Sequence, residues 1–307
     1  MSLPSPTRVS VIDLGTFSAI LLIAEVRHGH LIPICEERQT IDLAYDRGRA
    51  ISLKAIARAV KIVRRFDRMV RESNSEKGLM VATAALRHAS NRFAVVRELR
   101  TITPLLIRVL TDRQEAQFAA RGALLGLPRI PHDALVVDIG GGSSEFIQPD
   151  TNAFRGLTIG AAWATSKWKD GCPRDRDKRD LYFLSCAEKV ILDLDTRSFT
   201  NRQRVVGLGG TITTLAAIQK GMKKFDVEGV HGSTLTSDWI TATAAQLSRM
   251  PDKSIRALVP FDPSSARVLT AGTYLWSRVL NRLDADRVTV SARGLRWGVA
   301  AHLAGLP

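Results

Sequence analysis

Two segments of the chain share one pattern of hydrophobic and polar positions. Residues 9–26 and 135–148 each contain two apolar, β-branched runs joined by a glycine-rich turn. In both, the first run contains an aspartate near its end, and glycine follows with serine or threonine beside it. The pattern predicts two β-hairpins whose tips bind phosphate, because glycine lets backbone N–H groups approach an anion and the hydroxyl adds a donor.

Glycine also occurs in tight turns that bind nothing, because such turns need its backbone conformation. Gly15 alone therefore does not distinguish a plain turn from a phosphate-binding loop. Three consecutive glycines at 140–142 exceed what a plain turn needs. A third glycine-rich turn follows at 206–211. The candidate phosphate-binding residues of the three turns are Gly15, Thr16, Ser18, Gly140, Gly141, Gly142, Ser143, Gly209, Gly210 and Thr211.

Asp13 and Asp138 follow the apolar runs of the two hairpins. A carboxylate beside a phosphate loop suits Mg²⁺, which proteins usually hold with one or two carboxylates plus phosphate oxygens and water. Both aspartates are therefore candidate metal ligands.

A helical period dominates residues 53–72, where apolar residues recur every three or four positions behind Ser52 as the N-cap. The opposite face carries a row of lysine and arginine side chains. This row is either simply exposed to solvent or a binding surface for anions. Further helices are expected at 92–100, at 113–125 behind Asp112 as cap, at 181–194, 237–249 and 263–283, and after Gly294. Strands are expected at 31–43, 79–83, 107–110 and 287–290, and residues 84–89 as a connection.

Both halves of the chain open with the same strand–aspartate–glycine–strand unit and finish with helices. This internal repeat predicts two related α/β subdomains, each with one phosphate loop, facing each other across a cleft. Pro128–Pro131 is the natural boundary. We expect subdomain I over 1–125 and subdomain II over 126–307, with the C-terminal helix from about residue 294 packing back on subdomain I.

Composition narrows the class of protein. The chain has 307 residues, enough for two packed domains, and 45% of them are hydrophobic, so it is globular. Three widely spaced cysteines argue against a disulfide framework, and neither a bilayer-spanning segment nor a signal-peptide pattern is expected. A cytoplasmic protein is the simple interpretation. The net charge of +14, from 44 Lys and Arg against 30 Asp and Glu, favours polyanionic partners without choosing among them.

Phosphoryl transfer to water needs clamped phosphates, neutralised charge and an oriented water. A carboxylate must orient or deprotonate that water. The candidates are Glu115, on the helix before the boundary, and Glu145, at the end of the second glycine loop. No Ser, Cys or His stands in an evident pattern of nucleophile and base, so a covalent intermediate is not expected.

In its ordered motifs the chain resembles the exopolyphosphatase / guanosine pentaphosphate phosphohydrolase (Ppx/GppA) family. The specific signature is Val137–Glu145, close to the family's Asp-Ile-Gly-Gly-Gly-Ser-x-Glu. The other matching segments are Val11–Ala24, Ala82–Asn91, Gln114–Ala116, Gly207–Thr211, Val230–Gly232 and Gly294–Gly298.

The resemblance implies an α/β fold of two actin-like (ribonuclease H-like, ASKHA superfold) subdomains. It implies that Glu115 activates the attacking water and that Glu145 helps to position water or metal, with Asp138 on the metal side. Arg87 and Asn91 would line the phosphate site. The implied cofactor is Mg²⁺ or another divalent cation, and the implied reaction is hydrolysis of terminal phosphate from inorganic polyphosphate.

Alternatives remain within and beyond this family. Guanosine pentaphosphate is the second candidate substrate, and a sensor that binds polyphosphate or an alarmone with weak turnover is a different class. A sugar or acetate kinase on the same superfold would need an acceptor motif, which the sequence does not contain. Neither nucleic acid nor a membrane is an expected partner, and the resemblance favours a homodimer.

The chain also departs from the family pattern. Ile20 replaces an arginine of the first loop, which removes a bidentate phosphate donor, and Phe17 replaces an asparagine. Gln114 replaces the first glutamate of the Glu-Glu-Ala element. From the resemblance we expect the chain to end with the two subdomains, without the helical extension of longer members. These differences blur substrate preference and leave the reaction class in place.

Overall fold

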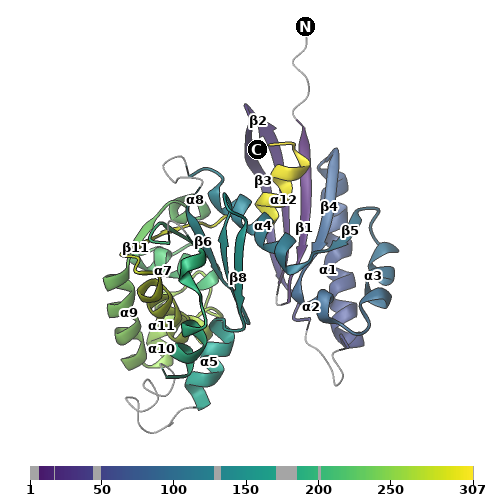
Figure 1. Cartoon of the computed structure of the whole chain (residues 1–307). Helices are drawn as coiled ribbons and strands as arrows, with labels where there is room; N and C mark the ends of the chain where they lie inside the picture. Colours follow the sequence, from purple (N-terminus) through teal and green to yellow (C-terminus); the bar gives the residue numbers. More distant parts are fainter. Residues whose placement is uncertain are drawn as a thin grey trace. The chain divides into compact units, whose positions relative to one another are not determined.

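The computed structural model describes residues 7–16, 18–43, 50–127, 133–170, 185–199 and 202–306, without side chains at 168–170. The chain divides into two compact units (Figure 1). The first unit comprises the chain up to Gly122 together with the segment from Leu295 onward, and the second unit comprises Ala123–Gly294.

The first unit contains a five-stranded mixed sheet in the order β3-β2-β1-β4-β5. Its first three strands pair antiparallel, whereas β4 and β5 run parallel to β1. The strands are β1 (Arg8–Leu14), β2 (Ser18–Arg27), β3 (His30–Thr40), β4 (Lys77–Ala82) and β5 (Leu106–Val109). The carboxyl ends of β1, β4 and β5 therefore lie at one edge of the sheet, where the first hairpin turn also lies.

Helices cover both faces of this sheet. They are α1 (Leu53–Glu72), α2 (Ala84–His88), α3 (Arg92–Arg100), α4 (Asp112–Leu124) and α12 (Leu295–Leu303). Ile12 and Leu14 of β1 share a core with α1, whose Ser52 hydroxyl accepts the N–H of Ala55 at 3.2 Å. Val11 alternates to the other face, and α12 packs against β1, β2 and β4.

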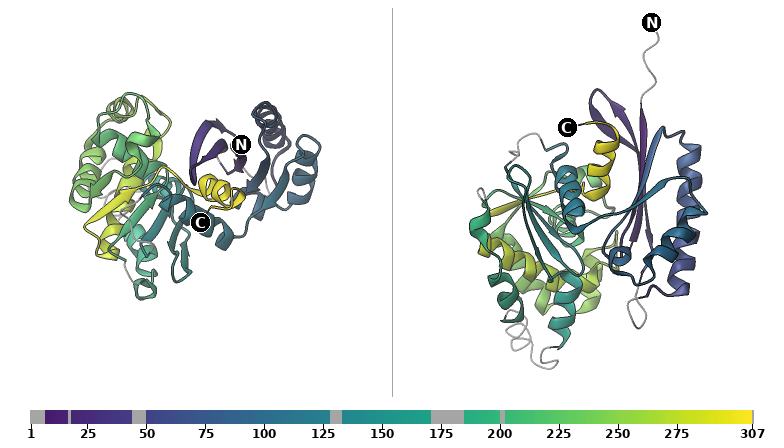
Figure 2. Two further views of the ribbon diagram at one scale, coloured as in Figure 1. Left: turned by 90° about the horizontal axis from the view of Figure 1, so that it is seen from above. Right: turned by 45° about the vertical axis from the view of Figure 1, so that its right-hand side comes forward.

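The C-terminal helix reaches the first unit from the far end of the sequence. Two further views show α12 beside the first strands (Figure 2). Gly298 allows a close helix crossing, because a Cβ there would lie 1.9 Å from the carbonyl oxygen of Phe118 in α4. Any larger residue would push the two helices apart.

The second unit repeats the connectivity of the first. Its sheet has the order β10-β11-β9-β6-β7-β8. The strands are β6 (Leu135–Ile139), β7 (Ser144–Gln148), β8 (Ala153–Leu157), β9 (Val205–Leu208), β10 (Thr234–Thr236) and β11 (Arg287–Val290). The series β8-β7-β6-β9-β11 corresponds to β3-β2-β1-β4-β5, with three antiparallel strands followed by two parallel ones. The predicted internal repeat is confirmed.

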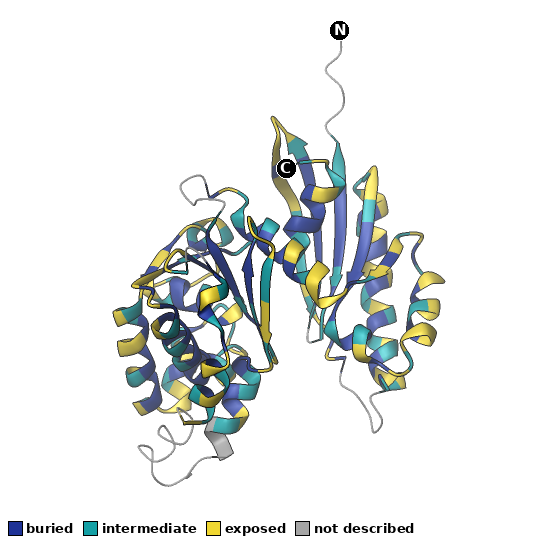
Figure 3. Ribbon diagram, viewed as in Figure 1, coloured by how far each residue is buried: buried dark blue, intermediate teal, exposed yellow. Residues whose placement is uncertain are grey.

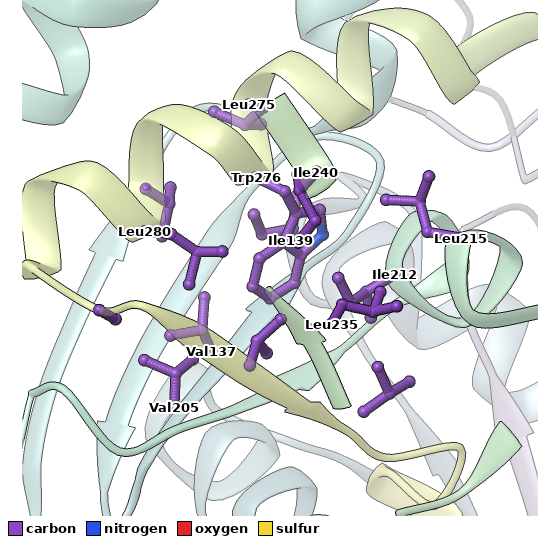
Figure 4. Packing of buried hydrophobic residues seen from close by; sticks show 14 of the residues in the cluster. Val137, Ile139, Val205, Ile212, Leu215, Leu235, Ile240, Leu275, Trp276 and Leu280 are labelled. Atoms are coloured by element: carbon purple, nitrogen blue, oxygen red, sulfur yellow. The ribbon is translucent and has the colours of Figure 1, made fainter. Parts of the chain in front are cut away.

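A large apolar core holds this second sheet against its helices. Val137 and Ile139 of β6 face Trp276 of α11 (Ala266–Leu283), as Figure 4 shows. The other helical segments are α5 (Ala161–Asp170), residues 185–192, the 3₁₀ turn Thr196–Ser198, α7 (Gly210–Gln219), α8 (Val227–Val230), α9 (Ser237–Arg249) and α10 (Asp252–Leu258). The inner strands β1 and β6 are mainly buried, whereas β3 and β8 are mostly exposed or half-buried, and the helices expose one side (Figure 3).

Most predicted elements are present. Helices 53–72, 92–100 and 237–249 and the strand at 287–290 have the expected bounds. Two predictions are wrong: residues 84–88 form a short helix rather than a connection, and the helix α4 is capped by Thr111 rather than by Asp112. The predicted boundary at Pro128–Pro131 lies outside the described residues. Across the described ranges no helix has the length and apolar character needed to cross a bilayer.

Candidate active site

The two hairpins have matching turns. The N–H of Gly15 donates to the carbonyl of Ser18 at 2.9 Å, and the N–H of Gly140 donates to the carbonyl of Ser143 at 3.0 Å. Both glycine amides are thus used to close the turn. The phosphate contacts predicted for these two glycines could not use those N–H groups.

The tip of the second hairpin has free donors. Within the described part of the chain, the N–H groups of Gly141 and Gly142 donate to no backbone carbonyl. Gly142 is exposed, and a Cβ there would meet no atom within 4 Å. In the first hairpin, Thr16 and Ser18 are partly buried, and Phe17 lies outside the described residues. The tip at 141–143 therefore supplies the clearest anion-binding geometry.

Asp138 and Glu145 are brought together by strand pairing. They are direct partners in the antiparallel register of β6 and β7, so both side chains project from the same face. Directly opposed side chains of such a pair have Cβ atoms about 5 Å apart, and like charges there repel. A divalent cation would relieve that repulsion, and two carboxylates suit Mg²⁺.

No cluster of three or more metal-binding side chains occurs among the residues with described positions. A metal at Asp138 and Glu145 would therefore need water or substrate oxygens to complete its coordination. Asp13 belongs to the first unit, where it alternates with Ile12 and Leu14 and so faces the α12 side of the sheet.

Two further glycine segments press against the base of the second hairpin. A Cβ on Gly209, which has φ +102°, would lie 2.3 Å from the carbonyl oxygen of Ile139 and 3.4 Å from Oδ1 of Asp138. A Cβ on Gly160 would lie 2.6 Å from the carbonyl oxygen of Gly140. Glycine is thus required at 160 and 209 for the backbones to approach the loop this closely.

Helix α5 begins directly under the loop. The N–H groups of Ala161 and Ala162 donate to the carbonyls of Gly140 and Gly141, both at 2.8 Å. The first amides of α5 are therefore occupied by the loop itself. They fix the carbonyl side of the loop, which leaves its N–H side for a ligand.

Helix α7 begins at the third glycine turn. Its N-cap is Gly209, which has no side chain to cap the first-turn N–H groups, so with Gly210 it can present backbone donors. Thr211 is placed differently. Its hydroxyl is buried and finds no hydrogen-bond partner in the part of the chain that the structure describes, and a Cβ on Gly272 would lie 2.5 Å from it. The phosphate contact predicted for Thr211 stays a prediction, and the position of its side chain does not favour it.

Glu115 lies in the first turn of α4. The turn is held by a capping box, in which Thr111 Oγ1 accepts the N–H of Gln114 at 3.2 Å and Gln114 Oε1 accepts the N–H of Thr111 at 3.1 Å. Glutamine and glutamate both serve at this position of the box. This explains why Gln114 can replace the family's glutamate without loss of the helix start.

The partner of Glu115 is Arg87. Arg87 Nη1 donates to Glu115 Oε2 at 2.8 Å and to the carbonyl of Leu110 at 2.9 Å. Its Nη2 forms an ion pair with Asp112. The family resemblance predicted that Arg87 lines the phosphate site. It did not predict the pairing of Arg87 with Glu115 and Asp112.

Burial raises the pKa of Glu115 above the usual carboxyl value of 4.5. The hydrogen bond and charge of Arg87 oppose the increase in the pKa, Asp112 adds to it, and His88 slightly opposes it. A carboxylate that is more basic than usual suits a general base.

Asn91 is engaged with the backbone. Its side-chain amide donates to the carbonyl of Ile51 and accepts the N–H of Ile51, both at 2.9 Å. The amide thus ties α3 to the segment that enters α1. Its predicted contact with phosphate stays a prediction.

The sequence missed two residues, Asp112 in the first unit and Gly160 in the second. Gly160 gave no signal, because it stands outside any glycine cluster and its role comes from contact with a loop 20 residues earlier. Asp112 had the signal of a helix cap, and its pairing with Arg87 depends on how β4 and β5 bring α2 and α4 together.

Comparison with known proteins agrees with these motifs. The profile of the Ppx/GppA phosphatase family matches residues 22–305. The protein named exopolyphosphatase 2 from Mycobacterium tuberculosis is 29% identical, over 97% of this chain and 99% of its own length. The crystal structure of the Aquifex aeolicus Ppx/GppA family member has a TM-score of 0.85 and 26% identity, and 98% of each chain is covered.

A structure described as an exopolyphosphatase from Cytophaga hutchinsonii has a TM-score of 0.79 at 24% identity, which supports the fold. Sheet order, strand directions and these structures confirm the predicted α/β fold class with two mixed sheets. The ordered motifs extend the match from the fold to the family. The chain belongs to the Ppx/GppA phosphatase family.

Proposed function

We propose that the chain is an exopolyphosphatase that hydrolyses the terminal phosphoanhydride bond of inorganic polyphosphate. The observation that carries the proposal is the carboxylate of Glu115, which is partly buried, more basic than usual and held through one oxygen by Arg87. Its other oxygen is the acceptor for a proton of the attacking water. Membership of the family and the exopolyphosphatase relative support the choice of reaction.

In the proposed step, water attacks the terminal phosphorus as Glu115 takes its proton. The bond between that phosphorus and the bridging oxygen breaks, which releases orthophosphate and a chain shorter by one residue. The backbone N–H groups of 141–143 would hold phosphate oxygens. Asp138 and Glu145 would hold Mg²⁺, which when bound neutralises charge on the phosphates.

Guanosine pentaphosphate is the second candidate substrate. The observation that favours it is the glycine turn at 209–210, which lies against the base of the phosphate hairpin and extends the site beyond a single loop. A nucleoside would need more contacts than a bare phosphate chain. The family name includes both activities, so the two substrates must be compared directly.

Phosphate release by the purified protein tests the proposal. Long-chain polyphosphate and guanosine pentaphosphate are supplied in parallel, with Mg²⁺ and with EDTA. We expect release from polyphosphate that needs Mg²⁺ and weakens as salt rises, because a polyanion on a basic protein releases counterions. Release from the nucleotide alone would favour the second candidate, and tight binding without release from either would favour a sensor. Undiminished phosphate release in EDTA would contradict the proposed requirement for a metal ion.

A further inference from the structure

Most of the N–H donors of Arg87 that can reach an acceptor are used within the protein. Its two Nη1 hydrogens are directed to Leu110 and Glu115, and Nη2 pairs with Asp112. Its Nε is buried and has no hydrogen-bond partner among the described residues, and only 15% of the side chain is exposed. Arginine has five N–H donors, so at most one Nη2 hydrogen remains for a ligand.

The three acceptors lie where β5 ends and α4 begins. The Leu110 carbonyl follows β5, Asp112 begins α4, and Glu115 stands one turn further on. Arg87 projects from α2, which follows β4, the strand paired with β5. The guanidinium therefore fixes the start of α4 to the carboxyl edge of the sheet and holds the Glu115 carboxylate by Oε2 alone.

We propose that Arg87 and Asp112 are positioning residues for the water-activating carboxylate: Arg87 holds one oxygen of Glu115 so that the other faces the water, and Asp112 holds Arg87. The proposal rests on the proposed function of Glu115. It replaces the role of phosphate ligand for Arg87.

The two residues act on the pKa of Glu115 in opposite directions. Burial raises this pKa, Arg87 lowers it, Asp112 raises it, and His88 lowers it. These are the charged groups that α2 and α4 direct at the carboxyl group. Loss of Arg87 therefore raises the pKa of Glu115, and loss of Asp112 lowers it. A general base works in its ionised form, so the acid limb of the rate profile follows this pKa.

The test combines kinetics on polyphosphate with pH profiles for Arg87→Met, Arg87→Lys and Asp112→Asn. Arg97→Met removes an exposed arginine of the same unit and is the matched control. For Arg87→Met we expect kcat at neutral pH to fall about tenfold to a hundredfold, because the variant loses part of the rate enhancement that a general base supplies. We expect KM to stay within about twofold of the wild-type value. Its acid limb moves to higher pH.

Arg87→Lys restores part of kcat, because it keeps the charge but lacks the planar fork of a guanidinium that reaches Leu110, Asp112 and Glu115. Asp112→Asn moves the acid limb slightly to lower pH, a small effect because the Asp112 side chain is 62% exposed. Arg97→Met changes neither kcat nor the profile.

A rise in KM with an unmoved acid limb in Arg87→Met would overturn the proposal and make Arg87 a phosphate ligand. A carboxyl ¹³C NMR titration of Glu115 in the wild type and Arg87→Lys tests the pairing without turnover. If the wild type hydrolyses nothing, the proposed function fails, and an unchanged Glu115 titration would separately reject the pairing. If Arg87→Met does not fold, Arg87→Lys and Asp112→Asn decide the question.

Discussion

The chemistry expected of single residues depends on what surrounds them. Glu115 is an ordinary helix carboxylate by sequence. Burial and the charge of Asp112 raise its pKa, and Arg87 opposes that increase. Asn91 was expected at phosphate and instead ties down the backbone of Ile51. Residue type is readable from a motif, whereas the partner of a side chain is set by the packing of distant strands.

His231 gives a prediction at this scale. One ring nitrogen lies 2.9 Å from the carbonyl of Leu125, and the other lies 3.3 Å from the Ser291 hydroxyl. Burial, then the charge of Arg293, lowers the pKa of His231 below 6.5, whereas the Leu125 bond and Glu228 oppose this. The folded state therefore favours the neutral ring. Its stabilising contribution is present above pH 6.5 and is lost as the pH falls through the lower folded pKa.

His231→Gln keeps an amide that can donate to the Leu125 carbonyl and removes this titration. We expect the wild type to lose about 0.5–1 kcal/mol more stability than the variant between pH 7.5 and pH 5, within the range of ordinary single-site effects. Urea midpoints at the two pH values measure it. His30→Gln, at an exposed position, is the control and should lose stability as the wild type does. Parallel pH curves for His231→Gln and the wild type would contradict the prediction.

Some helices and strands have a clear hydrophobic period in the sequence, and others do not. The helix α1 and its Ser52 cap were predictable, because one face is apolar at helical spacing and a serine precedes it. The helices α5 and α7 were missed. In α7, a run of β-branched and small residues buries several sides at once, so no polar stripe marks it as a helix. The short helix α2 has only five residues, too few for a period to be visible.

The third glycine turn gives a prediction at the scale of elements. Gly209→Ala would place a Cβ 2.3 Å from the Ile139 carbonyl oxygen at a φ of +102°, so α7 would have to move from the base of the hairpin. We expect a loss of about 3 kcal/mol or more in the free energy of unfolding.

Gly210→Ala is the matched control, because a Cβ there meets nothing within 4 Å and its φ is not left-handed. Its free energy of unfolding should stay within about 1 kcal/mol of the wild type. Urea denaturation measures both variants. Equal midpoints for the two substitutions would show that the contact between Gly209 and the hairpin is not required.

At the scale of the whole molecule, the internal repeat was the most informative signal. Two similar glycine hairpins predicted two related sheets, and the sheets do share strand order and direction. The strand β10 at the edge of the second sheet was not foreseen. Helix α12 belongs to the first unit, and the close crossing of Gly298 with α4 gives the physical reason.

The candidate site residues also divide into those that the sequence predicts and those that only the packing reveals. Each hairpin, with its aspartate and turn, was predictable because strand pairing alone sets it: Asp138 and Glu145 share a face by register. The contacts made by Gly160, Asp112 and the Arg87 guanidinium depend on tertiary packing, and no local pattern contains them. The site was therefore predictable within the hairpins and not around them.

The most direct test of the central claim is phosphate release from polyphosphate by Glu115→Gln, measured beside binding of the same polymer. If Glu115 activates the water, release should fall by about 10²–10⁴, because the amide cannot take the proton, while binding stays near the wild-type value. Circular dichroism and the urea midpoint would confirm that the variant is folded. A folded Glu115→Gln protein that releases phosphate at the wild-type rate would contradict the account.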